Sequence, residues 1–436
     1  MAEEVPIGVA PAVPRHFPRW ISQASSAAAP RVRWLERAEY TVALAVVFFS
    51  PMNFLRLQAF YFTLSDAFAC LCLILMLVNR SWPLRPLGPL WTSAWGAGFI
   101  VFTSSLLVSS LVNGDPLRGM ILVGQYFFSY FLLLPVLVGR PIAQTTGLVR
   151  VYVLSVFLMC LHGIYLVEWD GQTNTTFVSG SGRLTGFVER ENECGAVIAM
   201  AMVLFLWLVS TGRLPKPLPV VVLPVMLYAV MLTGSNTALA AFSFALAVYL
   251  LATLSWSRLV LYAAGVVGAV MLLAAHAREF LPAVFQKRVL GALETGDLAQ
   301  AGSFDHRLEL IYEALERADG TMLLGVGADQ YQVASFLNQP VHNLYLLLWT
   351  EGGLLCVIGF LMMLLSGLGP AAAAFKTRNG FMYAVCTFSM ISMFLLFINA
   401  FPHVYGRFWA VPVLLGVAVS VAYIRTGERR RLPARF

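Results

Sequence analysis

The sequence predicts an all-α integral membrane protein with about twelve transmembrane helices. Two observations lead to this prediction. Of the 436 residues, 59% are hydrophobic and only 12% are charged, whereas a soluble domain carries about 25% charged residues. The apolar residues also gather into runs of about 20 residues, the length that crosses a bilayer as a helix. Most of the chain is therefore expected to lie in a membrane.

The individual apolar runs give the predicted spans. Arg56 and Gln58 interrupt the end of the first run. The predicted spans are residues 39–56, 60–79, 91–112, 118–139, 146–168, 194–212, 217–234, 237–255, 259–276, 352–374, 380–400 and 404–424.

The charges give the orientation of these spans. The net charge of +7 does not indicate nucleic-acid binding here, because membrane proteins collect Lys and Arg in their cytoplasmic loops. With the N-terminus inside, basic residues fall in every cytoplasmic loop, and nearly all Asp and Glu beyond Glu39 fall outside, with Glu428 as an exception. Both termini are therefore expected in the cytoplasm. The cytoplasmic basic residues are Arg80, Arg85, Arg140, Arg150, Arg213, Lys216, Arg258, Lys376, Arg378 and Arg429 to Arg431.

The chain divides into five parts along its length. The first is a cytoplasmic tail, in which Ala27 to Ala29 resemble a cleavage site but no apolar segment precedes them, so we expect no signal peptide. The parts are the tail 1–38, nine spans in 39–276 with a periplasmic loop at 169–193, a large periplasmic loop 277–340, an interfacial helix with three spans in 341–424, and a basic cytoplasmic tail 425–436.

The large loop 277–340 is far longer than ordinary connections and is therefore expected to be functional. Within it, apolar residues recur at helical spacing and charged residues occupy the other positions. We predict an amphipathic helix that lies on the membrane or caps the bundle, and a second short helix after residues 325–327. The predicted apolar face is Phe304, Leu308, Ile311, Tyr312 and Leu315.

Polar residues gather on the predicted outer side, where membrane proteins often carry function. Arg183 and Arg190 end the loop 169–193, while Arg288 and Arg307 lie in the large loop. The segment 233–237, TGSNT, has the composition of a tight turn followed by a helix cap.

Each of these arginines also has a plain structural interpretation. Arg190 could be an interfacial anchor, and Arg288, next to Lys287, could belong to a solvated patch. Arg307 could pair with Glu309 or Glu313 on its own helix. His403 is likewise expected at the membrane interface.

The segment 341–355, VHNLYLLLWTEGGLL, carries the candidate catalytic residue. His342 stands with Asn343 and Tyr345 at the edge of an apolar stretch that is too long for one straight span. We predict a short interfacial helix that carries His342, a bend at Gly352 and Gly353, and then a membrane helix. Glu351 is expected to be structural, bonding backbone at this bend.

Outward arginines and one histidine suit a particular chemistry. Arginine side chains bind phosphate oxygens in paired hydrogen bonds, and a neutral histidine takes a proton from a hydroxyl near pH 7. Together they favour transfer of a group from a membrane-held phosphate ester to an alcohol. The sequence has no outward Asp-x-Asp pair and no His/Glu or cysteine spacing typical of metal ligands, so we expect neither a metal nor another cofactor.

Four segments then carry a resemblance to a known family. They are VHNLYLLLWTEGGLL at 341–355, RLTGFVERENECGAVIAM at 183–200, LTGSNTALAAF at 232–242, and Arg307 followed by GVGADQY at 325–331. With the expected span layout, the sequence resembles the O-antigen ligase and polymerase superfamily of bacterial envelope glycosyltransferases over nearly its whole length. The resemblance implies a C-type glycosyltransferase-like membrane fold in the bacterial inner membrane.

The resemblance also implies an activity. The donor would be a polysaccharide on undecaprenyl diphosphate, and for ligase members the acceptor would be a sugar hydroxyl of the lipid A core on the periplasmic side. Transfer would invert the anomeric centre without metal, in contact with membrane lipids. The implied general base is His342, with Arg190 and Arg307 at the diphosphate or sugar. Arg288 is added from its place in the basic loop, and Arg183, Asn343 and Tyr345 complete the predicted substrate-binding set.

Two positions depart from the family pattern, and three other functions stay open. The chain has Asn236 where the family often has Arg, and Glu191-Asn192 where it often has Pro-Asn, so another arginine would bind the phosphates. The alternatives are an O-antigen polymerase, a protein O-oligosaccharyltransferase and a glycolipid transporter without chemistry. A transporter predicts charges at mid-membrane and broken helices there, whereas here the charges lie outside.

Overall fold

The computed structural model describes residues 33–57, 61–215, 217–253, 281–291, 304–377 and 379–429. Nearly all regular structure in these ranges is helical, apart from a small hairpin of β1 (Arg56–Leu57) and β2 (Phe62–Thr63). The predicted span 259–276 and most of the two predicted tails lie outside the described residues.

Most helices lie close to the predicted spans, but the first runs from Arg33 to Phe49 and not over 39–56, because Arg56 belongs to a short strand. In chain order they are α1 (Arg33–Phe49), α2 (Leu64–Val78), α3 (Pro89–Asn113), α4 (Pro116–Tyr126), η2 (Phe127–Leu132), α5 (Leu133–Leu137), α6 (Ile142–Ile164), η3 (Tyr165–Trp169), η4 (Gly186–Val188), α7 (Glu191–Ser210), α8 (Leu218–Thr233), α9 (Asn236–Ala252), α11 (Ala283–Phe285), η5 (Gln286–Leu290), α14 (Phe304–Asp319), α15 (Gln330–Ala334), α16 (Leu344–Gly352), α17 (Leu354–Ser366), α18 (Leu368–Phe375), α19 (Phe381–Phe397) and α20 (Arg407–Arg429).

Six helical stretches among the described residues are long and apolar enough to cross a membrane. Four shorter apolar helices, α2, α8, α9 and α19, accompany them. Charged residues occupy the first two turns of α1, which belongs to neither group. The all-α membrane architecture is thus confirmed, while the complete set of spans stays a prediction. The six stretches are Pro89–Asn113, Pro116–Leu137, Ile142–Trp169, Glu191–Ser210, Leu354–Phe375 and Arg407–Gly427.

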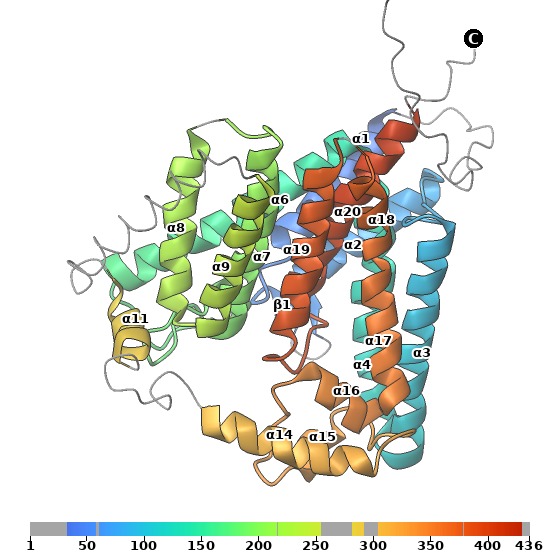
Figure 1. Ribbon diagram of the computed structural model, residues 1–436, viewed down its shortest axis with the longest axis vertical. Coiled ribbons are helices and arrows are strands. Elements are labelled where there is room, and N and C mark those ends of the chain that lie inside the picture. Colours follow the sequence, from blue (N-terminus) through green and yellow to red (C-terminus); the bar gives the residue numbers. More distant parts are fainter. Residues whose placement is uncertain are drawn as a thin grey trace, which may run out of the picture.

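The long helices form a bundle with two distinct ends (Figure 1). At one end α14 lies across the bundle, with α15 and α16 beside it. At the opposite end α20 runs out toward the C-terminus. We call these the α14 end and the tail end.

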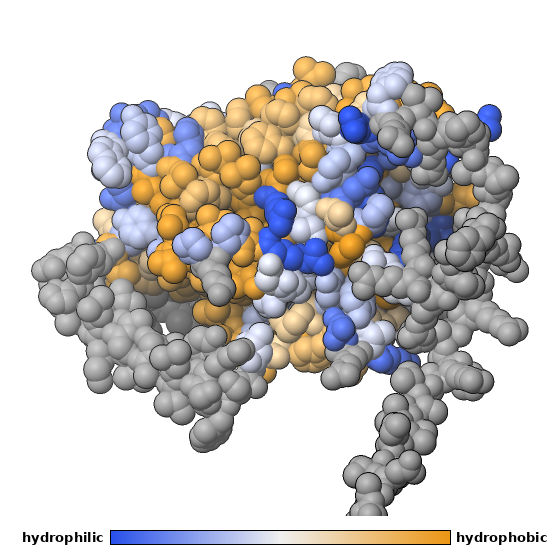
Figure 2. Space-filling view, turned by 90° about the horizontal axis from the view of Figure 1, so that it is seen from above, coloured by the Kyte–Doolittle hydropathy of each residue, from blue (hydrophilic) through white to orange (hydrophobic). Residues whose placement is uncertain are grey.

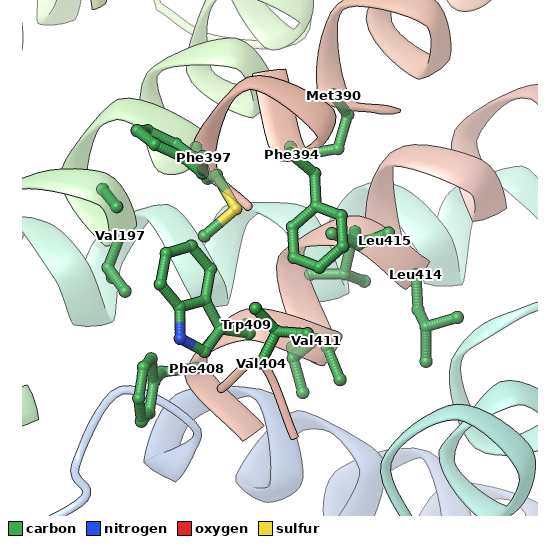
Figure 3. Packing of buried hydrophobic residues seen from close by; sticks show 14 of the residues in the cluster. Val197, Met390, Phe394, Phe397, Val404, Phe408, Trp409, Val411, Leu414 and Leu415 are labelled. Carbon is green, nitrogen blue, oxygen red and sulfur yellow. The ribbon is translucent and has the colours of Figure 1, made fainter. Parts of the chain in front are cut away.

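The centre of the bundle is built on aromatic packing around Trp409, near the start of α20. Its ring centroid lies 4.9 Å from that of Phe401, 5.8 Å from that of Phe397 and 5.9 Å from that of Phe408. Figure 3 shows how Phe397 of α19 and Phe408 and Trp409 of α20 lie together. The segment 398–406, which joins α19 to α20, rests directly on this core. Its position is therefore fixed by large buried rings, which contribute strongly to core packing.

Basic side chains fasten the tail end to backbone oxygens. Arg425 donates to the carbonyl oxygens of Gly139 at 2.7 Å, Arg85 at 3.0 Å and Pro86 at 3.1 Å. Arg150 donates to the carbonyl oxygen of Arg213 at 2.5 Å. Loops that the charge pattern assigned to one side of the membrane therefore meet at one end of the bundle. Seen from this end, hydrophilic residues form patches at the left, middle and right of the face, between broad hydrophobic areas (Figure 2).

A buried ion pair lies beneath this end. Arg140 and Glu39, each 8% exposed in its side chain, approach to 3.2 Å. Asn79 and Ser81 donate to the same Glu39 carboxylate, at 3.1 and 2.6 Å. The pair and its hydrogen bonds satisfy a charge that would be costly to bury alone.

Candidate active site

The helix break predicted after Glu351 is present. α16 ends at Gly352, Gly353 adopts φ +82°, and α17 starts at Leu354. A β-carbon at Gly353 would lie 2.4 Å from the carbonyl oxygen of Leu323, so the break needs glycine both for its left-handed backbone and for space. The membrane helix thus begins anew after the bend.

The prediction that the short helix carries His342 is wrong, because α16 begins at Leu344, two residues later. Asn343 is the N-cap, whose side chain accepts a hydrogen bond from the Leu346 N–H at 3.2 Å, and His342 lies just before it. Asparagine at this position ends the extended approach and starts the helix. His342 is therefore set on the loop side of a helix start, half-buried.

Backbone bonds fix this helix start against α19. The Leu344 N–H donates to the Ile398 carbonyl oxygen at 2.8 Å, and the Tyr345 hydroxyl donates to that of Leu395 at 3.0 Å. The polar groups of Asn343 and Tyr345 are thus engaged in the structure around His342. Their predicted contact with substrate stays a prediction.

Glu351 is buried and attaches a loop to α16. Its carboxylate accepts a hydrogen bond from the Tyr331 N–H at 3.4 Å. Its own carbonyl oxygen accepts from the Gly327 N–H, and that of Thr350 accepts from the Val326 N–H, both at 2.9 Å. The backbone bonded to the Glu351 carboxylate is that of Tyr331 in α15, and not that of the bend where it was expected. The segment before α15 brings the end of α14 against α16.

The amphipathic helix predicted in the large loop is present as α14. Its buried face consists of Leu310, Ala314 and Ala318, small or medium side chains that allow α14 to lie close to its neighbours. Leu308, Tyr312 and Leu315, on the predicted apolar face, are 41%, 64% and 45% exposed, so contact of this face with the membrane stays a prediction. The short helix expected after residues 325–327 is α15.

Arg183 is buried at the turn between α8 and α9. Its Nε donates to the Thr233 carbonyl oxygen and its Nη2 to the Asn192 Oδ1, both at 2.8 Å. Nη1 lies 3.8 Å from the Glu191 carboxylate. Burial, together with the positive charges of Arg288 and Arg307, lowers the pKa of Arg183 to about 10, although Glu191 acts in the opposite direction.

The turn itself brings a second arginine beside the first. Gly234 caps α8 with φ +56° and ψ 27°, and Ser235 caps α9 by accepting from the Ala238 N–H at 3.3 Å, so the predicted turn and cap are confirmed. A β-carbon at Gly234 would lie 3.3 Å from Arg288 Cδ and 3.4 Å from Arg183 Nε. The two guanidinium side chains therefore share the space over this glycine.

Arg307 is the third member of this group. It lies in the first turn of α14, where burial and then the charge of Arg288 lower its pKa. Its Nε is buried without a hydrogen-bond partner among the described residues. The carboxylates proposed as its partners are used elsewhere, Glu309 beside His306 at 3.9 Å and Glu313 with Arg317 at 3.1 Å. We call Arg183, Arg288 and Arg307 the arginine cluster.

Arg190 stands apart from the cluster at the start of α7. It occupies the N-cap position, and its side chain is 67% exposed with Nη1 3.7 Å from the Glu193 carboxylate. The exposed guanidinium is open to a further partner. An exposed ion pair of this kind contributes little to stability.

Burial and nearby positive charges act together on His342. Burial, and then Arg307, Arg190, His306 and His403, which oppose a positive charge on the imidazole, lower the pKa of His342 to about 4. The imidazole is therefore neutral at pH 7 and has a free nitrogen lone pair for a proton. The structure thus brings Arg190 and the arginine cluster's Arg307 into electrostatic reach of the predicted base.

One part of the site was not anticipated from the sequence. A small cavity of about 40 Å³ is lined by Arg190 together with Tyr61, Glu193, His403, Tyr405, Gly406 and Phe408. Its residues come from three separate segments, none of which has a motif. His403 lies in the loop before α20, and nothing in the sequence around it distinguished it from an interfacial histidine. Within the described ranges, no group of three or more His, Cys, Asp or Glu side chains is arranged to hold a metal.

Residues 221–361 match the family model described as O-antigen ligase. The match includes the 233–237 turn, Arg288, Arg307 and His342. This part of the chain is similar to the O-antigen ligase family, which supports the O-antigen ligase and polymerase superfamily. No curated protein matches the chain. The match supports a ligase- or polymerase-type function in lipopolysaccharide biosynthesis, and the long apolar helices support a multi-pass membrane protein.

Proposed function

We propose that the protein is an O-antigen ligase that transfers a polysaccharide from undecaprenyl diphosphate to a sugar hydroxyl of the lipid A core. The observation that carries the proposal is a neutral histidine at the edge of a group of arginines. His342 supplies a base, and the arginine cluster with Arg190 supplies positive charge beside it. The family match supports the same class of reaction.

The proposed reaction forms one bond and breaks another. The acceptor hydroxyl oxygen attacks the anomeric carbon of the donor, and His342 takes the hydroxyl proton. The bond between the anomeric carbon and the diphosphate oxygen breaks, and its electron pair leaves with the diphosphate. Attack from the side opposite the leaving group inverts the anomeric centre. Undecaprenyl diphosphate is released as an anion and requires no proton.

The arginines stabilise the departing charge. Guanidinium groups bind phosphate oxygens in paired, charge-assisted hydrogen bonds, and a buried site strengthens such contacts. Arg183 and Arg288 meet over Gly234, and the charge of Arg307 acts on Arg183. Burial, and then the repulsion between these cations, lower the pKa of Arg183 and Arg307, and an anionic ligand would relieve the repulsion.

Donor binding would also change the base. Without the donor, burial and the neighbouring cations lower the pKa of His342 to about 4. The negative charge of the diphosphate offsets Arg307 and Arg190, and so raises the pKa of His342 toward its ordinary value. His342 would therefore become a stronger base only when the donor is in place.

We place the reaction at the periplasmic face of the bacterial inner membrane. The basic loops meet at the tail end, and membrane proteins keep such loops in the cytoplasm. The α14 end, with His342 and the arginine cluster, would then face the periplasm, and both termini would be cytoplasmic.

Reconstitution tests this assignment. Purified full-length protein in lipid nanodiscs is mixed with a synthetic undecaprenyl-diphosphate oligosaccharide and lipopolysaccharide that lacks O-antigen. A ligase gives the oligosaccharide covalently bound to the lipid A core, detected by mass spectrometry, with no product when either substrate is omitted. Lengthening of the glycan on its own carrier would identify a polymerase instead. Movement of the unchanged donor across liposomes without any covalent product would identify a transporter.

A further inference from the structure

The small cavity beside Arg190 differs in chemistry from the arginine cluster. Glu193 and the rings of Tyr61, Tyr405 and His403 contribute to its wall, so a carboxylate and aromatic groups replace the concentrated positive charge. A carboxylate repels a phosphate but accepts hydrogen bonds from hydroxyl groups. Aromatic edges and faces suit the C–H surfaces of a sugar ring. The lining therefore favours an uncharged, hydroxyl-rich ligand.

The part of the cavity wall formed by Tyr61 is held by an ion pair, a cation–π contact and a hydrogen bond. The guanidinium of Arg56 pairs with the carboxylate of Glu189 and lies over the Tyr61 ring, 4.9 Å from its centroid. Asn53 donates to the same carboxylate at 3.1 Å. These contacts join the start of the β1–β2 hairpin to the residue before Arg190. Tyr61 is thus placed relative to α7 before any ligand binds.

The part of the cavity wall formed by the loop before α20 is held by hydrogen bonds and an ion pair. The Tyr130 hydroxyl donates to the Val404 carbonyl oxygen at 2.8 Å, and Arg407 donates to that of Tyr405 at 3.0 Å. Arg407, which is 3% exposed, also pairs with the fully buried Asp66. The backbone on either side of Tyr405 is thereby held between α20, α2 and η2. Such preorganisation reduces the cost of binding.

The cavity also adjoins the proposed base. His403 and Arg190 both line it, and both act electrostatically on His342. A hydroxyl-bearing group seated here would therefore lie in the neighbourhood of His342, beside residues other than the arginine cluster. Two ligands of different character could then meet at one histidine.

We propose that this cavity is the acceptor subsite, which binds a neutral sugar of the lipid A core through its ring edge and hydroxyl groups. The proposal rests on the transfer reaction proposed above. Glu193 and Arg190 bind hydroxyls as acceptor and donor, and Tyr61 and Tyr405 contact the ring. The diphosphate stays with the arginine cluster.

The volume of the cavity limits the size of the group that it can bind. A buried water needs about 10–15 Å³ of such space, so about 40 Å³ accommodates a group the size of about three waters. This is enough for one edge of a ring with one or two hydroxyls, and too small for a whole saccharide. The subsite would thus bind one terminal sugar while the rest of the core stays outside.

The test uses the core oligosaccharide alone, released from lipopolysaccharide that lacks O-antigen and stripped of its lipid. Its binding to the full-length protein in nanodiscs is measured by calorimetry for wild type, Tyr61→Ala, Tyr61→Phe and His403→Gln. We expect about 5- to 10-fold weaker binding for Tyr61→Ala and His403→Gln, in line with the loss of one ring contact or one hydrogen bond. Tyr61→Phe keeps the ring and should bind nearly as wild type.

The matched control is Tyr312→Ala, which removes a tyrosine that is 64% exposed on α14 and outside the cavity. It should leave binding unchanged, and equal thermal unfolding midpoints would show that the variants are folded. Equal binding by Tyr61→Ala, His403→Gln and wild type, or no binding by wild type, would overturn the acceptor subsite.

Kinetics separate this proposal from the transfer reaction itself. With both substrates, Tyr61→Ala should raise the apparent KM for the acceptor about 5- to 10-fold and leave that for the lipid-linked donor unchanged. A parallel rise in donor KM would assign the cavity to the donor and overturn the proposal. If wild type binds the oligosaccharide and the variants do not, yet no product forms, the subsite stands and the ligase assignment fails.

Discussion

Arginines at the two ends of the bundle have different surroundings. At the tail end, Arg425 and Arg213 donate to carbonyl or hydroxyl oxygens of neighbouring segments, and Arg140 pairs with Glu39. At the α14 end, Arg183 also donates to protein oxygens, but burial and then the charge of Arg288 lower the pKa of both Arg183 and Arg307.

The difference separates stability from function. An arginine bonded to oxygens of neighbouring segments links those segments, and the oxygens offset its positive charge. Cations gathered beside one another repel, and a fold retains them where a ligand supplies the missing negative charge. We therefore expect substitutions at the tail end to change stability, and substitutions at the α14 end to change substrate handling. Four experiments test this contrast.

Removal of the base should have the largest effect. His342→Ala is expected to lower kcat about 10²- to 10⁴-fold, the usual contribution of a general base, while the protein inserts and folds normally. The measurement is the rate of transfer from the lipid-linked donor to lipopolysaccharide lacking O-antigen. In a cell whose own ligase is deleted, the O-antigen ladder on a gel should disappear.

The control is His162→Gln. His162 contacts the rings of Phe177 and Phe187, so the change should cost some stability without abolishing transfer. Full transfer by folded His342→Ala would remove His342 from the reaction.

Loss of one cluster arginine should have the next largest effect. Arg307→Met removes a charge-assisted contact to the diphosphate worth about 1.5–3 kcal/mol, which corresponds to about 10- to 150-fold in donor KM or kcat. Initial rates at varied donor concentration measure both quantities. Arg307→Lys should recover part of the loss, since lysine keeps the positive charge but lacks the paired N–H donors of the guanidinium group.

The matched tail-end variant is Arg425→Met. It removes hydrogen bonds to carbonyl oxygens and should lower the unfolding temperature by a few degrees while the donor KM stays at its wild-type value. A donor KM that rises equally in both variants would abolish the proposed contrast between the ends.

Two glycines with similar backbone but different surroundings provide a finer test. Gly234 and Gly212 have φ of +56° and +66°, so alanine at either costs about 1–2 kcal/mol of stability. A β-carbon at Gly234 would crowd Arg183 and Arg288, whereas one at Gly212 would meet nothing within 4 Å. We expect both variants to melt earlier, and only Gly234→Ala to raise the donor KM several-fold. Identical donor KM values would show that the packing over the turn is irrelevant to binding.

The smallest expected effect is the response to pH. A base with a pKa of about 4 becomes protonated, and so loses its function, only as the pH falls toward 4. Between pH 7 and 5.5, kcat/KM for the donor, which reports the free enzyme, should therefore change less than about 2-fold. An unperturbed histidine with a pKa of about 6.5 would lose about 8-fold over the same range, and that outcome would contradict the burial and charge found around His342.

The fold was predictable because its signals are local. Apolar runs and basic loops gave the helices and the common side of the basic residues, and the left-handed Gly353 lies where the paired glycines predicted a bend. The start of α16 was misplaced because a helix cap depends on the conformation of Asn343, which apolar spacing does not reveal. For α14, the apolar spacing predicted the helix but not which of its residues pack against the protein, because small residues such as Ala314 are buried there.

The candidate site was predictable only in its parts. His342, Arg183, Arg288 and Arg307 were each recognisable as polar residues on the outer side. Their grouping depends on distant segments meeting over the 233–237 turn, which no spacing within the sequence specifies. The cavity was missed because its residues belong to three segments without a shared pattern, and Glu351 was assigned to the wrong backbone for the same reason.

The bond from the Leu344 N–H to the Ile398 carbonyl oxygen has a consequence for how such a protein could diversify. It joins the start of α16, beside His342, to the first residue of the segment that carries His403 and Tyr405. The spacing between the base and the cavity is therefore a property of the backbone. Side chains in the cavity could be exchanged from one lineage to another to suit a different terminal sugar, and the histidine would remain aimed at the same point.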